Sequence, residues 1–471
     1  MTAILPTPAN FELRFQVLIV GGGGTALTAA LAASDAGADV LVLERDATPS
    51  GSTAMSTGLI PAAGTPEQAA QGIEDSPERF LADILTKTKD DTLREYARTL
   101  TIESARTVAW LRDVHGVPLS LAEGWLYPGH SAMRMYGTPS RSGAELMAAL
   151  DRAVKNTDTT VLTNATVNAL FADGSTMTGV RASRPNGEIL DIGGDAVVLA
   201  CSGFGGNAAL VAQHIPEMVG AVYHGHPGNK GDALAWGESL GAAIADIGAY
   251  QGHGGLAVGY GVPILWPLIM EGGFQVNTEG WRFSNEAAGY SEQAAKVNAQ
   301  PGQIAWSIFD ERLHALMMEF EDYRDAVRAG AVVQASSMDD LANRTKIPAD
   351  ALATTMQEVG AMNAGEQTDP FGRDFTGRLP LQPPYRAAKV TGALFHTQGG
   401  LTVDRDGRVL KKDGMPLPNL FAGGGAARGI SGSGADGYLA GNGLLTATTL
   451  GRLAGRAAAA LARLSKEPTA A

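Results

Sequence analysis

The sequence predicts an α/β protein in which a parallel β-sheet domain is interrupted by an inserted α+β domain. An apolar run at residues 15–20 leads through four glycines into an alanine-rich helix at 25–36, and a second apolar run follows at 40–43. Two later segments, around residues 196–206 and 419–425, also join an apolar run to a glycine turn. Strands that end in glycine turns and lead into helices are typical of sheets covered on both faces.

The order of these segments divides the chain into three stretches that form two domains. Residues 1–240 hold the first part of the sheet domain, and residues 241–377, where the glycines loosen, form an inserted capping domain. Residues 378–471 return to the sheet domain, because strand and glycine character resumes after Pro383 and Pro384. The further elements expected are strands at 161–162, 167–171 and 196–200 and helices around 304–320, 351–362 and 444–464.

Cysteine content limits the chemistry that the chain can carry. Its 471 residues include one cysteine, Cys201. An internal disulfide, a four-cysteine iron–sulfur cluster and a CxxCH haem attachment are therefore excluded. A redox enzyme of this composition has to pass its electrons to a soluble partner.

Charge and hydropathy point away from nucleic acids and membranes. The formal net charge is −13 and no run of lysines or arginines occurs, so the electrostatic signature of a nucleic-acid-binding protein is missing. The sequence has no charge-free apolar run of about 18 residues. Residues 1–16 lack the basic start and apolar core of a signal peptide. We expect a cytoplasmic protein without a membrane span.

The first strand–helix–strand unit carries the fingerprint of a Rossmann-like dinucleotide site. Residues 21–26 fit GxGxxG/A with Ala26 in the last position, and Glu44 lies about 20 residues on, at the end of the second strand. Glycines let the backbone approach a pyrophosphate, and the helix N-terminus offers free N–H groups. The acidic residue accepts hydrogen bonds from ribose hydroxyls.

Three later segments favour FAD over a nicotinamide dinucleotide. Small and hydroxyl-bearing residues follow the acidic strand end at 49–54, and two more strand-to-glycine junctions occur far along the chain. FAD lies extended across such a fold and uses several junctions. The residues assigned to the FAD site are Gly21, Gly23, Gly24, Thr25, Ala26, Glu44, Arg45, Gly51, Ser52, Thr53, Gly58, Ser202, Gly203, Asn207, Asp232, Gly424, Gly425, Asn442, Leu444 and Leu445.

Several segments occur in a characteristic order and spacing. They are the first strand–helix–strand unit, Gly51-Ser-Thr-Ala, Asn229-Lys-Gly-Asp-Ala, Trp281-Arg-Phe-Ser-Asn-Glu, Phe395-His-Thr-Gln-Gly-Gly and residues 419–425. With them the chain resembles the fumarate reductase/succinate dehydrogenase flavoprotein superfamily over essentially its whole length. The resemblance implies a Rossmann-like FAD-binding domain of the glutathione reductase type, interrupted by a mobile α+β capping domain.

Two departures from the superfamily concern the cofactor. A glutamate usual in the third glycine junction is Gly425 here, so one contact to the flavin ribityl chain has to come from elsewhere. Succinate dehydrogenases attach FAD covalently through a histidine in the region that corresponds to residues 51–64. This chain has no histidine there, so the resemblance implies noncovalent FAD.

Histidines and tyrosines stand where the superfamily places its substrate site. In fumarate reductases one arginine delivers a proton, and a second arginine and two histidines hold the dicarboxylate. His253 and His396 stand at positions similar to those histidines, but Tyr290 and Tyr438 occupy the regions of the arginines. Tyrosines there resemble those of the 3-ketosteroid dehydrogenases, although Ala440 replaces a serine of the 4-ene-forming branch. Tyr127 resembles a tyrosine–proline segment that lines those pockets.

The resemblance assigns roles to the tyrosines. Tyr438, with a backbone N–H of the Gly441 turn, would stabilise negative charge as it develops on a ketone oxygen. Tyr290, as a phenolate, would take the proton alpha to the ketone while a hydride moves from the beta carbon to flavin N5. Because the pKa of free tyrosine is about 10, this role requires the site to lower the pKa of Tyr290.

Other patterns are interpreted as structural. Arg282 is expected to form a salt bridge, whereas Arg134 and Arg141 stay candidates for holding a substrate carboxylate. The GxSxG string at 237–241 falls in a helical run and not at a strand-to-helix elbow. The His-Gly-His string at 224–226 has no third ligand at a metal-binding spacing.

We predict an FAD-dependent oxidoreductase acting on CH–CH groups, which desaturates a cyclic ketone between its alpha and beta carbons. The substrate is a small-molecule ketone or carboxylate, and the acceptor is soluble. Three alternatives stay open: a reductase of an unsaturated carboxylate such as fumarate or urocanate, a flavoprotein subunit of a membrane electron-transfer complex, and an FAD-binding scaffold without turnover. The catalytic candidates are Tyr290, Tyr438, His396, His253 and Tyr127.

Overall fold

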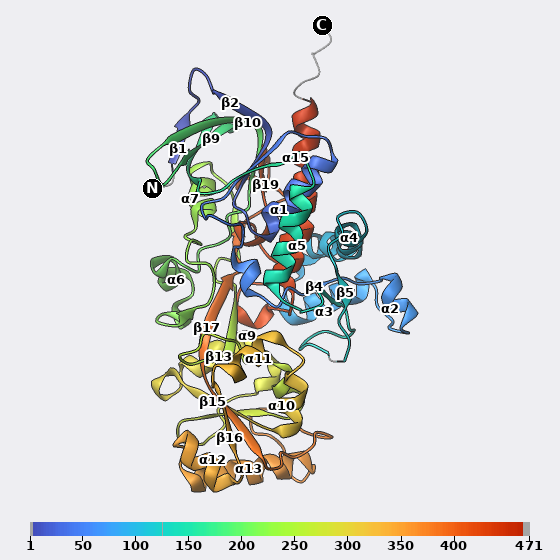
Figure 1. Ribbon diagram of the computed structural model, residues 1–471, viewed down its shortest axis with the longest axis vertical. Helices are drawn as coiled ribbons and strands as arrows, with labels where there is room; N and C mark the ends of the chain where they lie inside the picture. Colours follow the sequence, from blue (N-terminus) through green and yellow to red (C-terminus); the bar gives the residue numbers. More distant parts are fainter. Residues whose placement is uncertain (1–2, 125, 465–471) are drawn as a thin grey trace.

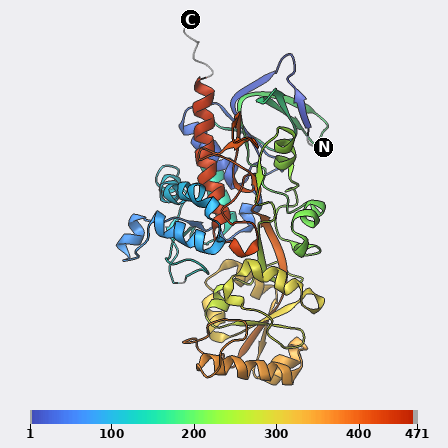
Figure 2. The same ribbon diagram turned by 180° about the vertical axis from the view of Figure 1, so that it is seen from behind.

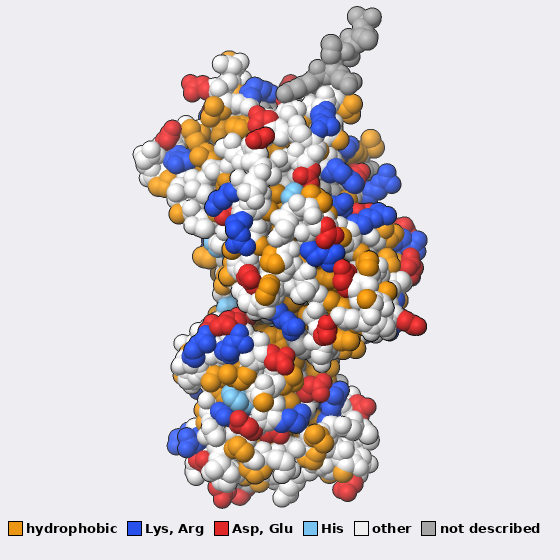
Figure 3. Space-filling view, turned by 45° about the vertical axis from the view of Figure 1, so that its right-hand side comes forward, with side chains coloured by type: hydrophobic (Ala, Val, Ile, Leu, Met, Phe, Trp, Pro, Cys, Tyr) orange, Lys and Arg blue, Asp and Glu red, His pale blue; other side chains and the backbone are white. Residues whose placement is uncertain are grey.

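The protein folds into two lobes that follow one another along its long axis (Figure 1). The computed structural model describes residues 3–124 and 126–464. A nine-stranded sheet lies in the upper lobe and a six-stranded sheet in the lower lobe. Figure 3 shows a narrowing between the lobes, with basic and acidic side chains interspersed over the visible face. No helix of the described residues is both long and apolar enough to cross a membrane, and the cytoplasmic location stays a prediction.

Five parallel strands form the centre of the upper sheet, in the order β20-β10-β2-β3-β7. Their bounds are Pro416–Ala422 for β20, Ile189–Leu199 for β10, Leu13–Val20 for β2, Val40–Leu43 for β3 and Thr160–Leu162 for β7. Every residue of β3 is buried, because both faces of a parallel sheet are covered. The strands expected at 15–20, 40–43, 161–162 and 196–200 are therefore confirmed, and so is the α/β fold class.

Two long helices pack side by side on this sheet. They are α1 (Gly24–Asp35) and α15 (Gly451–Leu464). Figure 2 shows α15 in red along the upper lobe. A Cβ atom at Gly455 would lie 2.1 Å from the carbonyl oxygen of Ala29. A Cβ atom at Gly451 would likewise lie 2.6 Å from the carbonyl oxygen of Thr25. Glycines therefore let the two backbones approach closely at the start and in the middle of α1.

The remaining elements of the upper lobe surround this core. The further strands are β1 (Ala3–Pro6), β8 (Thr166–Asp173), β9 (Thr176–Ser183), β19 (Arg408–Leu410) and the short strands β4 (Ile60–Pro61), β5 (Ser120–Leu121), β6 (Met135–Gly137), β12 (Ile244–Ala245) and β18 (Gly400–Leu401). The further helices are α2 (Pro66–Ala70), α3 (Pro77–Thr88), α4 (Arg94–Asp113), α5 (Gly143–Lys155), α6 (Ala208–His214), α7 (Asp232–Ser239) and α14 (Asn442–Leu445). The predicted helix 444–464 corresponds to α14, a π-helical turn and α15.

The lower lobe is built around the long strand β17 (Tyr385–Thr397). Its partners are β11 (Val222–Tyr223), β13 (Tyr250–Ala257), β15 (Ala305–Asp310) and β16 (Val332–Ala335), and β14 (Phe274–Asn277) pairs with β15. The helices of this lobe are α8 (Pro267–Met270), α9 (Tyr290–Asn298), α10 (Glu311–Met317), α11 (Glu321–Arg328), α12 (Met338–Thr345) and α13 (Ala349–Asn363). Strands β13 and β17 run from this lobe toward the upper one (Figure 1).

One predicted helix was wrong and another was confirmed. Residues 305–310, expected to be helical within 304–320, form the buried strand β15, and α10 occupies only 311–317. A short apolar run is compatible with a strand or a helix. Residues 305–310 form a strand because they pair with β14 and β17. The helix expected at 351–362 is α13.

The predicted domain boundaries at 240/241 and 377/378 stay predictions. The apolar core of the lower lobe draws its residues from 257–390. Because β13 and β17 take part in both lobes, the lobes are joined by continuous sheet and not by a linker.

A buried cluster of charges holds the lower lobe together below the site. Arg282 pairs with Glu286 at 2.9 Å and with Asp369 at 2.6 Å, and Arg373 pairs with Glu286 at 3.1 Å. Burial alone would raise the pKa of Glu286, but Arg373 and Arg282 outweigh it and hold this pKa below its usual range. The salt bridge expected of Arg282 is confirmed.

We expect Glu286→Gln to lower the free energy of unfolding by about 3 kcal/mol, because it leaves two buried guanidinium groups without their shared carboxylate. Urea unfolding followed by circular dichroism measures the change. Glu321→Gln, which alters an exposed carboxylate of the same lobe, is the control. A change of less than about 1 kcal/mol for Glu286→Gln would show that the cluster contributes no more than a surface pair.

Candidate active site

One long cavity extends from the glycine turn after β2 to the junction of the two lobes. It contains about 1910 Å³ of space between atoms, part of it open to solvent. All five catalytic candidates line it, together with fourteen of the twenty residues assigned to the cofactor. The fourteen are Gly21, Gly23, Gly24, Thr25, Glu44, Arg45, Gly51, Ser52, Thr53, Ser202, Asp232, Gly424, Gly425 and Leu444.

The N-terminus of α1 opens onto the cavity. Its N-cap residue is Gly23, which makes no side-chain cap, so first-turn N–H groups have no partner within the helix. A Cβ atom at Gly23 would meet nothing within 4 Å, whereas one at Gly21 would lie 2.5 Å from the Ala200 carbonyl oxygen. The loop is therefore closely packed against the protein on one side and open on the other, as an anion-binding turn requires.

Acidic and basic groups surround the next part of the cavity. Glu44, at the end of β3, is buried, and burial raises its pKa. Arg45 lies 3.6 Å from Asp232 at the start of α7. His226 lies 2.7 Å from Asp46. A buried carboxylate at this strand end suits the hydroxyls of a ribose.

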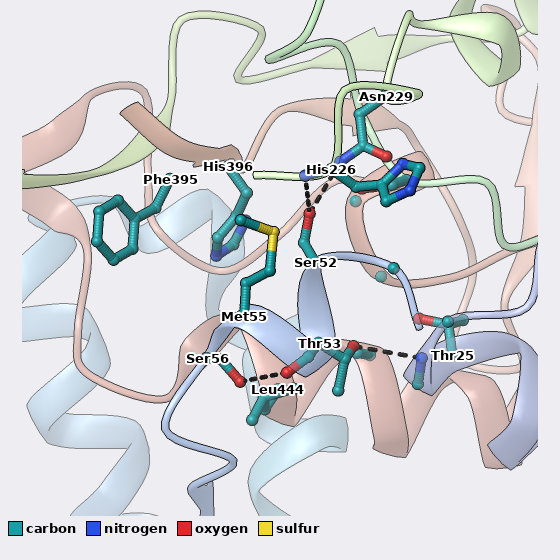
Figure 4. Close-up of a pocket in the computed structure, with 18 of the residues that line it drawn as sticks. Thr25, Ser52, Thr53, Met55, Ser56, His226, Asn229, Phe395, His396 and Leu444 are labelled. Atoms are coloured by element: carbon teal, nitrogen blue, oxygen red, sulfur yellow. Dashed lines mark hydrogen bonds between the residues drawn. The ribbon is translucent and has the colours of Figure 1, made fainter. Parts of the chain in front are cut away.

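The hydroxyl-rich turn 51–56 is tied to two other segments of the wall (Figure 4). Ser52 Oγ accepts hydrogen bonds from the His226 N–H and from Asn229 Nδ2, both at 3.0 Å. Thr53 Oγ1 accepts from the Gly24 N–H at 3.3 Å. Ser52 and Thr53 thus position the turn against the glycine loop and the 226–229 loop.

These features match the shape and chemistry of FAD. The uncapped helix start and the open space at Gly23 suit a pyrophosphate, and Glu44 suits a ribose. Behind them, Gly424 and Gly425 keep the third junction free of side chains, since Thr25 and Ser202 lie directly against them. The cavity then continues to the lobe junction, so its lining residues run from the glycine loop to the aromatic cluster.

Six residues assigned to the cofactor lie behind the cavity wall. Asn207 caps α6 with its side chain, and the Asn442 side chain donates to the Ile430 carbonyl oxygen at 3.2 Å. Ala26 and Leu445 are core residues. Gly58 and Gly203 lie against Ser142 and Thr397, where a side chain would clash. Their role is to support the residues that face the cavity.

An aromatic cluster forms the other end of the cavity. The Tyr290 ring lies 6.0 Å from Tyr438, 5.2 Å from His253 and 6.2 Å from Trp266, measured between ring centroids. His396 lies 6.0 Å from Tyr438. Residues far apart in the sequence therefore meet in one place, because α9 of the lower lobe faces the 437–441 turn of the upper lobe.

The two phenols lie next to one another at this end of the cavity. Their ring centroids are 6.0 Å apart, and the Tyr438 hydroxyl lies near the backbone of Gly441 and Gly443. A neutral phenol carries one O–H donor and lone pairs that accept, so each hydroxyl can donate or accept a hydrogen bond in the cavity.

The expected lowering of the Tyr290 pKa was wrong. Burial raises the pKa of Tyr290 well above its ordinary value, and Tyr438 and Tyr127 raise it further. Burial also raises the pKa of Tyr438. An apolar, aromatic surrounding disfavours a phenolate, so both groups are neutral phenols near pH 7.

Both histidines are neutral. His253 stacks on Phe395 with ring centroids 5.1 Å apart, and its Nδ1 accepts from the Gly255 N–H at 3.1 Å, which leaves the proton on Nε2. Burial lowers the pKa of His253 to about 3 and that of His396 to about 4. They can donate or accept hydrogen bonds but carry no charge for a carboxylate.

The arginine candidates do not reach the cavity. Arg134 is fully buried and pairs with Asp75 at 2.9 Å and Asp83 at 2.6 Å, so its proposed role with a substrate carboxylate was wrong. Arg141 does not line the cavity. Among the described residues that line it, Arg45 is the only arginine or lysine. The GxSxG string lies in and after α7, and the described chain contains no cluster of three metal-ligating side chains.

Several lining residues escaped the prediction from sequence. They are Met55, Leu59, Met135, His224, Gln251, Pro263, Leu265, Trp266, Asp322, Phe395 and Gln398. Phe395 and Gln398 flank His396 inside a recognised segment, which was a usable signal. Trp266 and Asp322 stand in no motif, and only the packing of the lower lobe brings them to the cavity.

Comparison with known proteins agrees with this geometry. The family profile described as "FAD binding domain" matches residues 16–444. An NADH:fumarate oxidoreductase of Klebsiella pneumoniae (strain 342) is 29% identical over 452 residues, which cover 95% of this chain and 48% of that protein. The chain thus spans about half the length of this relative.

Two further similarities concern ketone-oxidising proteins. A 4-oxocyclohex-2-ene-1-carboxylate 5-dehydrogenase of Sinomonas cyclohexanicum is 31% identical over 305 residues, covering 56% of this chain and 51% of that protein. The crystal structure of a 3-ketosteroid-delta4-(5alpha)-dehydrogenase from Rhodococcus jostii RHA1 is 25% identical with a TM-score of 0.76. The match covers 97% of this chain and all of that one.

Proposed function

This chain belongs to the FAD-binding domain family and is an FAD-dependent oxidoreductase, and on that premise we propose that it introduces an α,β carbon–carbon double bond into a cyclic ketone. The observation that carries the proposal is the pair of adjacent phenols, Tyr290 and Tyr438, whose rings lie 6.0 Å apart at the end of the cavity. A ketone needs a donor for its oxygen and an acceptor for its alpha proton. The pair offers both, and the similarity to the two ketone dehydrogenases supports the assignment.

The cofactor half of the cavity holds FAD through the helix start at residues 23–25, Glu44 and the turns around Ser52 and Gly424. When bound, FAD supplies the acceptor for the hydride that leaves the beta carbon. The residues assigned to these contacts, and the soluble electron acceptor that completes the cycle, are part of the proposal.

The phenol pair moves protons without forming a phenolate. Tyr290 accepts the alpha proton as its carbon–hydrogen bond breaks, and it passes its own proton to Tyr438. Tyr438 in turn gives its proton to the ketone oxygen, so an enol forms while both phenols stay neutral. After the hydride has left the beta carbon, the oxygen returns its proton to Tyr438, and the phenol pair releases one proton to water through the open part of the cavity. The net loss from the ketone is one proton and one hydride.

The surrounding groups position the ketone. His253, Trp266 and Phe395 line the same cavity, and the His253 ring contacts the other two rings. Tyr127 lines the cavity near both phenols. Lys87 bonds the Ala288 carbonyl oxygen at 2.9 Å and Glu292 at 2.7 Å, which fixes the start of α9 and with it Tyr290.

A reductase of fumarate-like substrates is the alternative, because the Klebsiella relative carries that name. Such a substrate bears two carboxylates, and no described arginine or lysine lies at the phenol end of the cavity. Burying a carboxylate without a counter-charge is costly. The cavity therefore favours the ketone.

The proposal is tested by mixing the FAD-loaded protein with cyclic ketones, ketosteroids included, under anaerobic conditions. We expect bleaching of the flavin absorbance and a product that has lost two hydrogens by mass spectrometry. The proposal would be wrong if no ketone bleached the flavin while fumarate steadily oxidised reduced viologen in the presence of the protein. The protein would then be a reductase of unsaturated carboxylates.

The proton transfer predicts a flat pH profile. Because burial raises the pKa of Tyr290 and Tyr438, both stay protonated between pH 6 and pH 9. We expect kcat/KM for flavin reduction by the ketone to change by less than about threefold over this range. A rise of about tenfold per pH unit would show instead that a phenolate is the base.

A further inference from the structure

The lower lobe contributes a single acidic side chain, Asp322, to the described lining of the cavity. Asp322 stands in the first turn of α11, which Figure 1 places at the end of this lobe nearest the upper lobe. Its side chain is half-buried, and no hydrogen-bond donor or cation among the described residues contributes to its pKa. Burial, with the neighbouring Asp325 and Glu321, raises the pKa of Asp322 to about 6, so the group is mostly ionised above pH 7.

Among the described lining residues, no positively charged side chain neutralises the Asp322 carboxylate. Arg45, the one cation of the wall, lies at the cofactor half against Asp232. His253 and His396 are neutral because burial lowers their pKa values.

The phenol end of the cavity is mostly apolar. Besides the aromatic cluster, its lining includes the apolar side chains Met55, Leu59, Met135, Pro263 and Leu265. Gln251 and Gln398, beside His396, are uncharged polar residues of the lining. A low-polarity wall weakens the screening between charges, so Asp322 acts over a longer distance than it would in water.

We propose that Asp322 is a specificity-determining residue that excludes anionic substrates from this cavity, so that the ketone oxidised here carries no carboxylate. That the substrate is a ketone rests on the proposed function. The exclusion of anions rests only on the charges of the side chains that line the cavity. It separates this chain from the Sinomonas relative, whose named substrate bears a carboxylate.

The test compares two ketones of nearly equal shape, 4-oxocyclohexanecarboxylate and 4-oxocyclohexanecarboxamide, with the FAD-loaded protein. Dissociation constants come from the perturbation of the flavin spectrum or from calorimetry, and turnover comes from flavin bleaching. We expect the wild-type protein to bind the amide more tightly. In Asp322→Asn the dissociation constant of the carboxylate divided by that of the amide should fall about tenfold, because the negative charge that repels the carboxylate has been removed.

The control is Asp325→Asn, which makes the same change of net charge on the exposed side of the same helix. It should leave the ratio unchanged. Tighter binding of the carboxylate by the wild type, or an equal ratio in wild type and Asp322→Asn, overturns the inference. A shifted binding ratio without oxidation of either ketone would sustain the exclusion of anions and count against the dehydrogenase, so the two failures are distinct.

Discussion

Replacing Tyr290 by phenylalanine is expected to lower kcat/KM for ketone oxidation by about 1,000-fold, within the range that loss of a general base produces. The variant keeps the aromatic ring and its contacts with His253 and Trp266 but removes the oxygen that accepts the alpha proton. Stopped-flow measurement of flavin reduction checks this result. Exchange of the alpha hydrogen with deuterated solvent should disappear in the same variant.

The matched control is Tyr260→Phe, which removes the hydroxyl of an exposed tyrosine in the lower lobe. It should leave flavin reduction unchanged. Tyr438→Phe should lower the rate by a comparable factor, because the proton relay passes through both hydroxyls. If Tyr290→Phe retained more than about a tenth of the wild-type rate with FAD fully bound, the phenol pair would not be the proton-transfer group.

Replacing Gly23 by valine is expected to weaken FAD binding by at least about 1,000-fold, roughly 4 kcal/mol, while the protein still folds. Gly23 has φ −79°, an ordinary conformation for any residue, and a Cβ atom there would meet no protein atom within 4 Å. The added side chain therefore projects into the cavity, where it displaces the pyrophosphate from the helix N-terminus. The flavin content of the purified protein and titration of the apoprotein with FAD measure the loss.

Gly21→Ala offers the contrast. Gly21 has φ +110°, and its Cβ atom would lie 2.5 Å from the Ala200 carbonyl oxygen. This variant should be less stable in urea even without FAD, whereas Gly23→Val should match the wild-type apoprotein. Normal FAD affinity in a folded Gly23→Val protein would place the pyrophosphate elsewhere.

Local sequence signals predicted the FAD domain well. The unit from β2 to Glu44 is contiguous in the sequence, and its strand pattern, glycine spacing and acidic strand end each follow from backbone geometry. Tyr290 and Tyr438 were predicted as a pair from the regions in which they stand. Their ring contact was not predicted, because it joins residues 148 positions apart in two lobes.

The incorrect predictions concern residues whose structure or role is set by contacts with distant parts of the chain. Residues 305–310 form a strand because β14 and β17 flank them on both sides, a fact that a window of sequence does not contain. Arg134 was a candidate for a substrate anion, but Asp75 and Asp83, more than 50 positions away, neutralise it in the interior.

The sequence by itself determined that this protein binds a dinucleotide through a strand–glycine–helix turn, because that signal is encoded within about 30 consecutive residues. Only the tertiary structure decided the charge state of the substrate site. Burial of Tyr290, His253 and His396 and the placement of Asp322 depend on how two lobes close on one cavity. The free energy of an ionised group is set by what surrounds it in space, and neighbours in space are not neighbours in the chain.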